Sequence, residues 1–113
     1  MAYMVTAIIR PWRLEEVRQA IHKAGVIGVT VSEVQGYGRQ GGKTEVFRGT
    51  EYSMHFVPKV KVEVIVGDAE VDAMVDAMTT AGRTGKIGDG KLWAVQLDRL
   101  VRIRTGEEGD DAV

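Results

Sequence analysis

The stretch KVKVEVIV, residues 59–66, is the clearest strand signal in this chain of 113 residues. A valine stands at every second position from 60 to 66, and alternate side chains of a strand point to the same face. Lys59, Lys61 and Glu63 fall on the opposite face. Charged residues on one strand face are usually exposed to solvent. Here that face begins where a long loop ends, so a binding site remains an open alternative.

The segment before this strand, residues 36–58, is rich in glycine and breaks the regular pattern. Five glycines fall between positions 36 and 49. A loop of this length in a small domain is uncommon and is usually functional or disordered. It also contains several cations, so we expect the rest of the chain to be a scaffold for this loop and for a second glycine-rich turn, residues 82–91.

The remaining elements complete a recognisable order. Apolar residues on both faces of 2–9 indicate a central strand, and helical apolar spacing indicates two helices. The strands are expected at 2–9, 26–34, 59–66, 91–97 and, briefly, 101–104; the helices are expected at 13–24 and from the capping residue Asp68 to Gly82. We expect the methionines of the second helix to lie in the core. The pattern is the βαββαβ order of ferredoxin-like α+β folds, with a long loop between strands 2 and 3.

Composition excludes several classes of protein. There are no cysteines and the net charge is −1, so disulfides, thiol catalysis and a global electrostatic grip on nucleic acid are not expected. No apolar run is long enough to cross a membrane, and no signal peptide is evident. These features predict a single cytoplasmic domain whose acidic tail, residues 106–113, is mobile or held by a neighbour.

The glycine motifs do not match the common nucleotide fingerprints. Residues 36–41 fit G-x-G-x-x-G, but no helical pattern follows, which argues against a dinucleotide fold. A partial likeness to an RNA-recognition motif fails because Arg39 and Gln40 replace the expected apolar residues. The turn GRTGKIGDGK, residues 82–91, suits an anion nest with Lys86 and Lys91, although a flexible turn explains it equally well.

Two further arginines and the absence of a catalytic set shape the functional reading. Arg102 and Arg104 share one face of the expected last strand, where they could bind phosphate or simply protect a sheet edge. The two histidines and two serines form no local catalytic or metal arrangement. The residues alone therefore favour binding of a small anion over catalysis.

Five segments together resemble the P-II nitrogen-regulatory signal proteins, in their order and spacing. They are AIIRPWRLEEVRQAI (7–21), TVSEVQGYGRQGGKTEVFRGTEY (30–52), FVPKVKVEVIV (56–66), TGKIGDGKLW (84–93) and VRIRTGEE (101–108). The resemblance implies one domain over residues 1–113 that forms a ferredoxin-like homotrimer. Its parts would be an effector loop at 37–56, a nucleotide loop at 82–91 and a C-terminal segment at 102–113.

The resemblance also implies binding of ATP or ADP in clefts between subunits. The adenine pocket would involve Ile8, Thr30 and Ile65, with Gly36 and Tyr37 nearby. The phosphates would be held by Gly38, Arg39, Gln40, Gly88, Asp89, Gly90 and Lys91, with Arg102 and Arg104 supplied by the neighbouring subunit. On this reading the glycine-rich turn is a phosphate cradle.

The effector implied by the resemblance is 2-oxoglutarate, bound together with Mg-ATP. Mg²⁺ prefers oxygen ligands and often uses substrate phosphates, and Gln40 would complete its coordination. Lys59 would pair with the distal carboxylate, while Gly38, Gly41 and Gly88 would offer backbone contacts. Because Gln40 and Lys59 flank the long loop, ligand binding is expected to reshape it.

Partners are expected to recognise the tip of the loop. By resemblance, Arg48 would enter an ammonium transporter, and Tyr52 would be modified by a nucleotidylyltransferase-type enzyme. Phe47, Thr50 and His55 depart from the family pattern and leave the modifying enzyme open. The prediction is a non-enzymatic regulator of nitrogen assimilation; a small ATP-hydrolysing enzyme and a structural interaction module are the alternatives.

Overall fold

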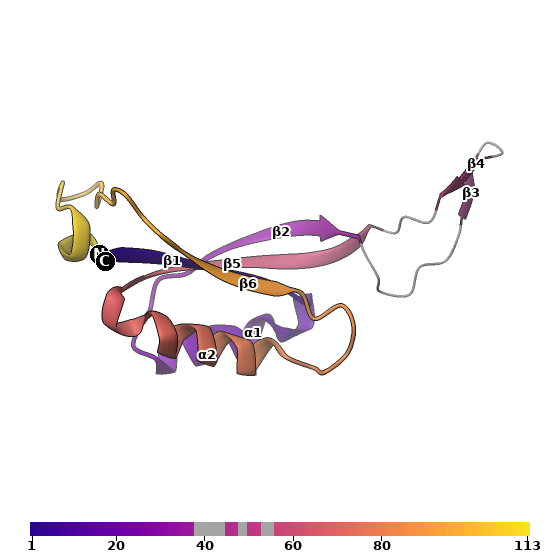
Figure 1. Ribbon diagram of the computed structural model, residues 1–113, viewed down its shortest axis with the longest axis horizontal. Coiled ribbons are helices and arrows are strands. Elements are labelled where there is room, and N and C mark those ends of the chain that lie inside the picture. Colours follow the sequence, from indigo (N-terminus) through magenta and orange to yellow (C-terminus); the bar gives the residue numbers. More distant parts are fainter. Residues whose placement is uncertain (38–44, 48–49, 53–55) are drawn as a thin grey trace.

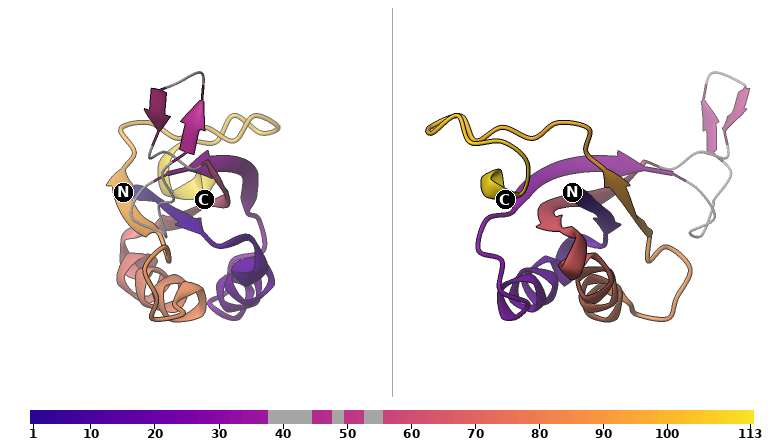
Figure 2. Two further views of the ribbon diagram at one scale, coloured as in Figure 1. Left: turned by 90° about the vertical axis from the view of Figure 1, so that its right-hand side faces the viewer. Right: turned by 60° about the vertical axis from the view of Figure 1, so that its left-hand side comes forward.

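The computed structural model describes residues 1–37, 45–47, 50–52 and 56–113. Four strands form an antiparallel sheet in the order β2-β5-β1-β6. They are β1 (Ala2–Ile9), β2 (Thr30–Gly36), β5 (Val57–Gly67) and β6 (Lys91–Gln96), and a separate hairpin joins β3 (Glu45–Phe47) to β4 (Thr50–Tyr52). The helices α1 (Leu14–Lys23) and α2 (Val71–Gly82) lie side by side on one face of the sheet (Figures 1 and 2).

This architecture confirms the predicted α+β fold. The strands β1 and β5 occupy the centre of the sheet, with Val5 opposite Val64 and Ala7 opposite Val62. The alternating valines of β5 are buried beneath the helices, as their period predicted. Met74 and Met78 of α2 are each 1% exposed and belong to the same core, also as predicted.

The second strand begins later than the sequence indicated. Its pairing with β5 starts at Thr30 opposite Glu63, not at Val26. The preceding residues still connect the helix layer to the sheet, and the Val26 amide bonds to the Ile21 carbonyl at 3.2 Å. β-Branched composition therefore extended the strand prediction into a connection.

The predicted helix cap was also wrong. A short 3₁₀ turn, Asp68–Glu70, precedes α2, and Asp68 makes no capping hydrogen bond. Its carboxylate instead lies 3.5 Å from the ammonium group of Met1. The Asp68 side chain, which the local sequence predicted to cap the helix, therefore forms a long-range ion pair instead.

The expected last strand, 101–104, was wrong as well. Val101 makes a single bridge to Glu108, and the residues between them form a turn. Gly106 has φ of 75°, a left-handed conformation that glycine adopts without steric penalty. Arg102 and Arg104 therefore do not share a strand face in this chain.

The sequence predicted an acidic tail that is mobile or held by a neighbour, but in the structure the tail contacts the start of its own chain. It forms the 3₁₀ helix Gly109–Ala112, and Asp110 lies 3.1 Å from the ammonium group of Met1. The two termini consequently meet at the end of the molecule opposite the turn between α2 and β6 (Figure 1).

The second face of the sheet carries neither helix (Figures 1 and 2). Strand alternation places Met4, Ile8, Ile65, Trp93 and Val95 on it, and the exposed fractions of Trp93 and Val95 are 44% and 42%. An apolar face of this kind is suited to burial against another surface.

Candidate functional site

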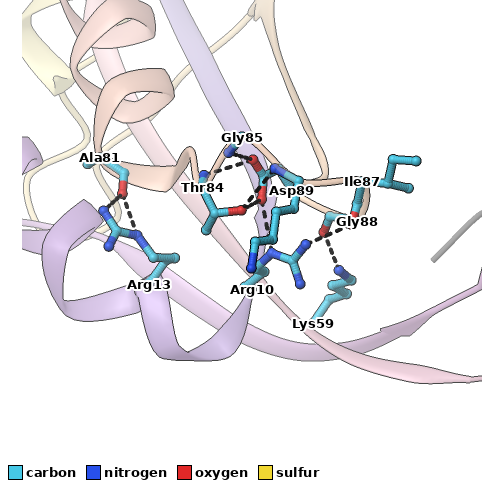
Figure 3. A network of polar contacts seen from close by, with 10 residues as sticks. Arg10, Arg13, Lys59, Ala81, Thr84, Gly85, Ile87, Gly88 and Asp89 are labelled. Carbon is cyan, nitrogen blue, oxygen red and sulfur yellow. Dashed lines mark hydrogen bonds and ion pairs between the residues drawn. The ribbon is translucent and has the colours of Figure 1, made fainter. Parts of the chain in front are cut away.

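The candidate site lies at one end of the sheet, around the turn between α2 and β6. The end of β1 and the start of β5 reach the same place, so the glycine-rich turn contacts residues from distant parts of the chain (Figure 3). Three features define it: a left-handed backbone, a carboxylate that ties the turn together, and a buried lysine.

The backbone of the turn requires glycine at Gly90. This residue has φ of 87°, and a Cβ built on it would lie 1.8 Å from the Ile8 carbonyl oxygen. Any side chain would therefore collide with the backbone of β1. Gly85 and Gly88 also have positive φ, of 88° and 104°. The turn follows a path that glycine alone makes inexpensive.

Asp89 organises the turn from within. Its carboxylate accepts hydrogen bonds from the amides of Thr84 and Gly85, both at 2.8 Å, and from the Thr84 hydroxyl. The guanidinium of Arg10 donates to the same carboxylate at 2.9 Å. The Thr84 hydroxyl, followed by Arg10, holds the pKa of Asp89 far below its ordinary value. The carboxylate is therefore ionised and occupied by its own turn.

Arg10 is a site residue that the sequence reasoning missed. It follows β1 directly and donates to Asp89 and, at 2.7 Å, to the carbonyl of Ile87. Both arginine and aspartate side chains are only 22% exposed, which limits solvent screening of the pair. A cation at the end of a predicted central strand was the available signal, but its partners lie more than 70 residues away in the chain.

Lys59 brings a positive charge into the same region. It is 5% exposed, and its ammonium group donates to the Gly88 carbonyl at 2.5 Å. Burial, together with the charge of Arg10, lowers the pKa of Lys59, and Asp89 opposes that shift. The sequence left open whether the charged face of β5 is exposed to solvent or forms part of a site. Lys59, the first charged residue of that face, is buried against the glycine-rich turn.

Several other predicted residues surround this centre. A Cβ on Gly36 would lie 3.7 Å from the Lys59 side chain, and Lys91 pairs with Ile8 across the sheet. Tyr37 meets Phe56 edge to face, with ring centroids 5.4 Å apart. The site therefore includes the point where the long loop leaves β2 and returns to β5.

The remaining predicted residues make none of the contacts described for this turn. Thr30 and Ile65 are on the sheet face without helices, while Arg102 and Arg104 belong to the C-terminal segment at the opposite end of the molecule (Figure 1). Tyr52 is the last residue of β4. The positions of Gly38, Arg39, Gln40, Gly41 and Arg48 fall outside the described residues.

This arrangement is suited to binding an anion. In the described part of the chain, no backbone hydrogen bond of a turn or loop is donated by the amides of Ile87, Gly88 or Gly90. Amides of this kind, next to lysine side chains, favour phosphate or carboxylate oxygens. Within the same described ranges there is no group of three acidic or histidine side chains that could hold a metal ion.

The comparison with known proteins decides the family. A family model described as nitrogen regulatory protein P-II matches residues 2–107. The chain belongs to the P-II family. Nitrogen regulatory protein GlnK of Escherichia coli is 49% identical to this P-II chain over 110 residues, covering 97% of the chain and 98% of GlnK. Nitrogen regulatory protein P-II of Microchaete diplosiphon is 53% identical, covering 96% and 97%.

A solved structure gives the same answer for the fold. The crystal structure of Arabidopsis thaliana PII bound to citrate superposes on this P-II chain with a TM-score of 0.79 and 38% identity, covering 98% of this chain and 88% of that one. The relatives are named as regulatory proteins, and this P-II chain is a regulator rather than an enzyme. No helix in the described ranges is long and apolar enough to cross a membrane.

Proposed function

We propose that this P-II chain senses ATP, ADP and 2-oxoglutarate and regulates nitrogen assimilation through its long loop. The observation that carries the proposal is the bond from buried Lys59 to the Gly88 carbonyl. It joins the strand that receives the long loop to a turn shaped for anions. Whatever occupies the turn can therefore act on the base of the loop.

The turn fits the phosphates of a nucleotide. Gly88 and Gly90 supply amides on a left-handed backbone, and Lys91 supplies charge. Asp89 would contribute through its backbone, because its carboxylate is already bonded within the turn. Gly38, Arg39 and Gln40 would complete the phosphate contacts. Ile8, Thr30, Gly36, Tyr37 and Ile65 would form the adenine pocket.

A homotrimer would bring the distant parts of this site together. Arg102 and Arg104 lie in the segment opposite the glycine-rich turn, so they can reach phosphates only on a neighbouring subunit (Figure 1). The sheet face without helices offers an apolar surface for such an assembly. Thr6, on that face, is 1% exposed, and its hydroxyl has no hydrogen-bond partner in the described part of the chain.

Lys59 is suited to recognise the effector. A buried ammonium group gains a strong interaction when a carboxylate arrives, because the surrounding dielectric is low. Gly38, Gly41 and Gly88 would add backbone contacts to 2-oxoglutarate. The keto acid would chelate a Mg²⁺ ion that is also held by the ATP phosphates and by the Gln40 side-chain oxygen.

The loop would pass this information to partners in the cytoplasm. Arg48 would contact an ammonium transporter, and Tyr52 would be the site for a nucleotidylyltransferase-type enzyme. Other regulators of nitrogen assimilation would recognise the same loop. Such switching requires that the ligands bind two loop states with different affinity.

Titration calorimetry tests the central claim. We expect 2-oxoglutarate to bind tightly in the presence of Mg-ATP, and weakly with ADP or without nucleotide. Repeating the titration with ATP and excess chelator separates the role of Mg²⁺ from that of ATP. Equal binding of 2-oxoglutarate under all these conditions would refute the mechanism.

A further inference from the structure

The C-terminal segment folds back on itself around Arg102. The Arg102 amide donates to the Glu107 carbonyl at 2.8 Å, and the Gly106 amide donates to the Arg102 carbonyl at 2.7 Å. The Gly109 amide then bonds to the Leu100 carbonyl at 3.0 Å. These contacts form a reversal that brings acidic residues next to the arginine.

The side chain of Arg102 is held by that reversal. One guanidinium nitrogen lies 3.0 Å from the Glu107 carboxylate, and another donates to the carbonyl of Val113 at 3.1 Å. We call these three residues the C-terminal latch. Glu108 and Asp110 are paired elsewhere, with Arg99 at 2.7 Å and with the Met1 ammonium at 3.1 Å. In the described part of the chain, the acidic side chain of the tail that forms an ion pair with Arg102 is that of Glu107.

We propose that the C-terminal latch is an autoinhibitory contact, which must open before Arg102 can bind nucleotide phosphate. Glu107 and the Val113 carbonyl occupy donors of the guanidinium that a phosphate would use. The inference rests on the proposed function, which assigns Arg102 to the phosphates. It adds a regulatory residue, Glu107, whose negative charge opposes nucleotide binding.

The chemistry of the pair supports competition. An arginine binds carboxylate and phosphate oxygens with the same planar set of donors. The side chains of Arg102 and Glu107 are 37% and 48% exposed, so the latch is weak and readily reversible. Opening it is expected to change nucleotide affinity by about two- to fivefold, because only the unlatched fraction binds.

The first test is ATP affinity of Glu107→Gln, which keeps the size of the side chain and removes its charge. We expect its Kd for Mg-ATP, measured by calorimetry at low ionic strength, to fall by about two- to fivefold. Glu108→Gln is the matched control, because it removes a neighbouring tail charge that pairs with Arg99. The control should not tighten binding. Equal or weaker binding by Glu107→Gln overturns the latch.

A second measurement separates the latch from a general charge effect. In an Arg102→Ala background, Glu107→Gln should leave the Kd unchanged, because the guanidinium that Glu107 occupies is gone. The gain from Glu107→Gln alone should also be larger for ATP than for AMP, which lacks the terminal phosphates. A gain that persists without Arg102, or that is equal for AMP, overturns the latch while leaving the proposed function intact. If the unmodified protein binds no ATP, the proposed function fails as well.

Discussion

Replacing Gly90 with alanine should damage the glycine-rich turn far more than the same replacement at Gly85. The two residues have nearly equal φ, 87° and 88°, so both substitutions strain the backbone similarly. Only at Gly90 does the added Cβ meet a backbone atom, the Ile8 carbonyl oxygen, at 1.8 Å. At Gly85 nothing lies within 4 Å of the new atom. The pair therefore isolates the collision from the strain.

The expected magnitudes follow from these two terms. A left-handed alanine costs about 1–2 kcal/mol, and overpacking against atoms that cannot move adds about 1–3 kcal/mol. The Ile8 carbonyl cannot move freely, because β1 is hydrogen-bonded on both sides, to β5 and β6. Gly85→Ala should therefore cost about 1–2 kcal/mol, and Gly90→Ala a total of about 2–5 kcal/mol.

Two assays check this reasoning. Thermal unfolding at fixed protein concentration should show a fall in Tm of roughly 4 °C per kcal/mol for a chain of this size. ATP titration should show that Gly90→Ala loses most nucleotide affinity while Gly85→Ala retains a measurable part. Equal losses of stability for the two variants would refute the close approach of Gly90 to β1.

Three further outcomes are expected. Arg10→Ala should reduce ATP affinity by about tenfold, because the turn loses a part-buried charged hydrogen bond. Arg18→Ala, which removes only an exposed ion pair, should leave the affinity unchanged. An equal effect of both substitutions would argue against an organising role for Arg10. Asp89→Asn should flatten the acid side of the curve of unfolding free energy against pH. Native contacts hold the pKa of Asp89 below its ordinary value of 3.8. The contribution of this carboxylate to stability is therefore present above about pH 4 and is lost as the pH falls through the native pKa. An acid unfolding curve that keeps its shape in this variant would contradict the assignment. Lys59→Met should abolish the 2-oxoglutarate response in calorimetry, because the buried ammonium group that would pair with the distal carboxylate is removed. Lys61→Met, on the same strand face but 37% exposed, should retain the response. Retention of the response by Lys59→Met would exclude the proposed effector contact.

Local periodicity predicted the layers of this fold but not its connections. The alternation of β5 and the apolar spacing of both helices were sufficient, because burial of one face is what those periods encode. The same rule failed at 101–104, where four alternating residues matched a strand but Gly106 reverses the chain soon afterwards. It also failed at Val26, where the chain is still leaving the helix layer. Short patterns lack the length that makes periodicity decisive.

The site shows a different limit of sequence reasoning. The glycines and lysines of the turn were visible, yet they left an anion nest and a flexible turn equally open. The choice depends on Arg10, whose contact with Asp89 spans 79 positions. A contact of that separation is formed by the sheet, not by the local sequence. The motif alone therefore indicated where an anion could bind. The contact between Arg10 and Asp89 explains why the turn would be ordered before an anion binds.

The features of this structure that are energetically unfavourable in the free protein lie where the proposed ligands would bind. Gly88 and Gly90 adopt left-handed conformations, and Lys59 is buried against a carbonyl. The helix-covered face of the sheet carries ordinary apolar packing. A chain selected for stability alone would have no reason to bury a lysine beside Arg10, whose charge opposes it. An arriving carboxylate would relieve that repulsion, so the charge of Lys59, which burial and Arg10 disfavour in the free protein, would contribute to binding of the effector.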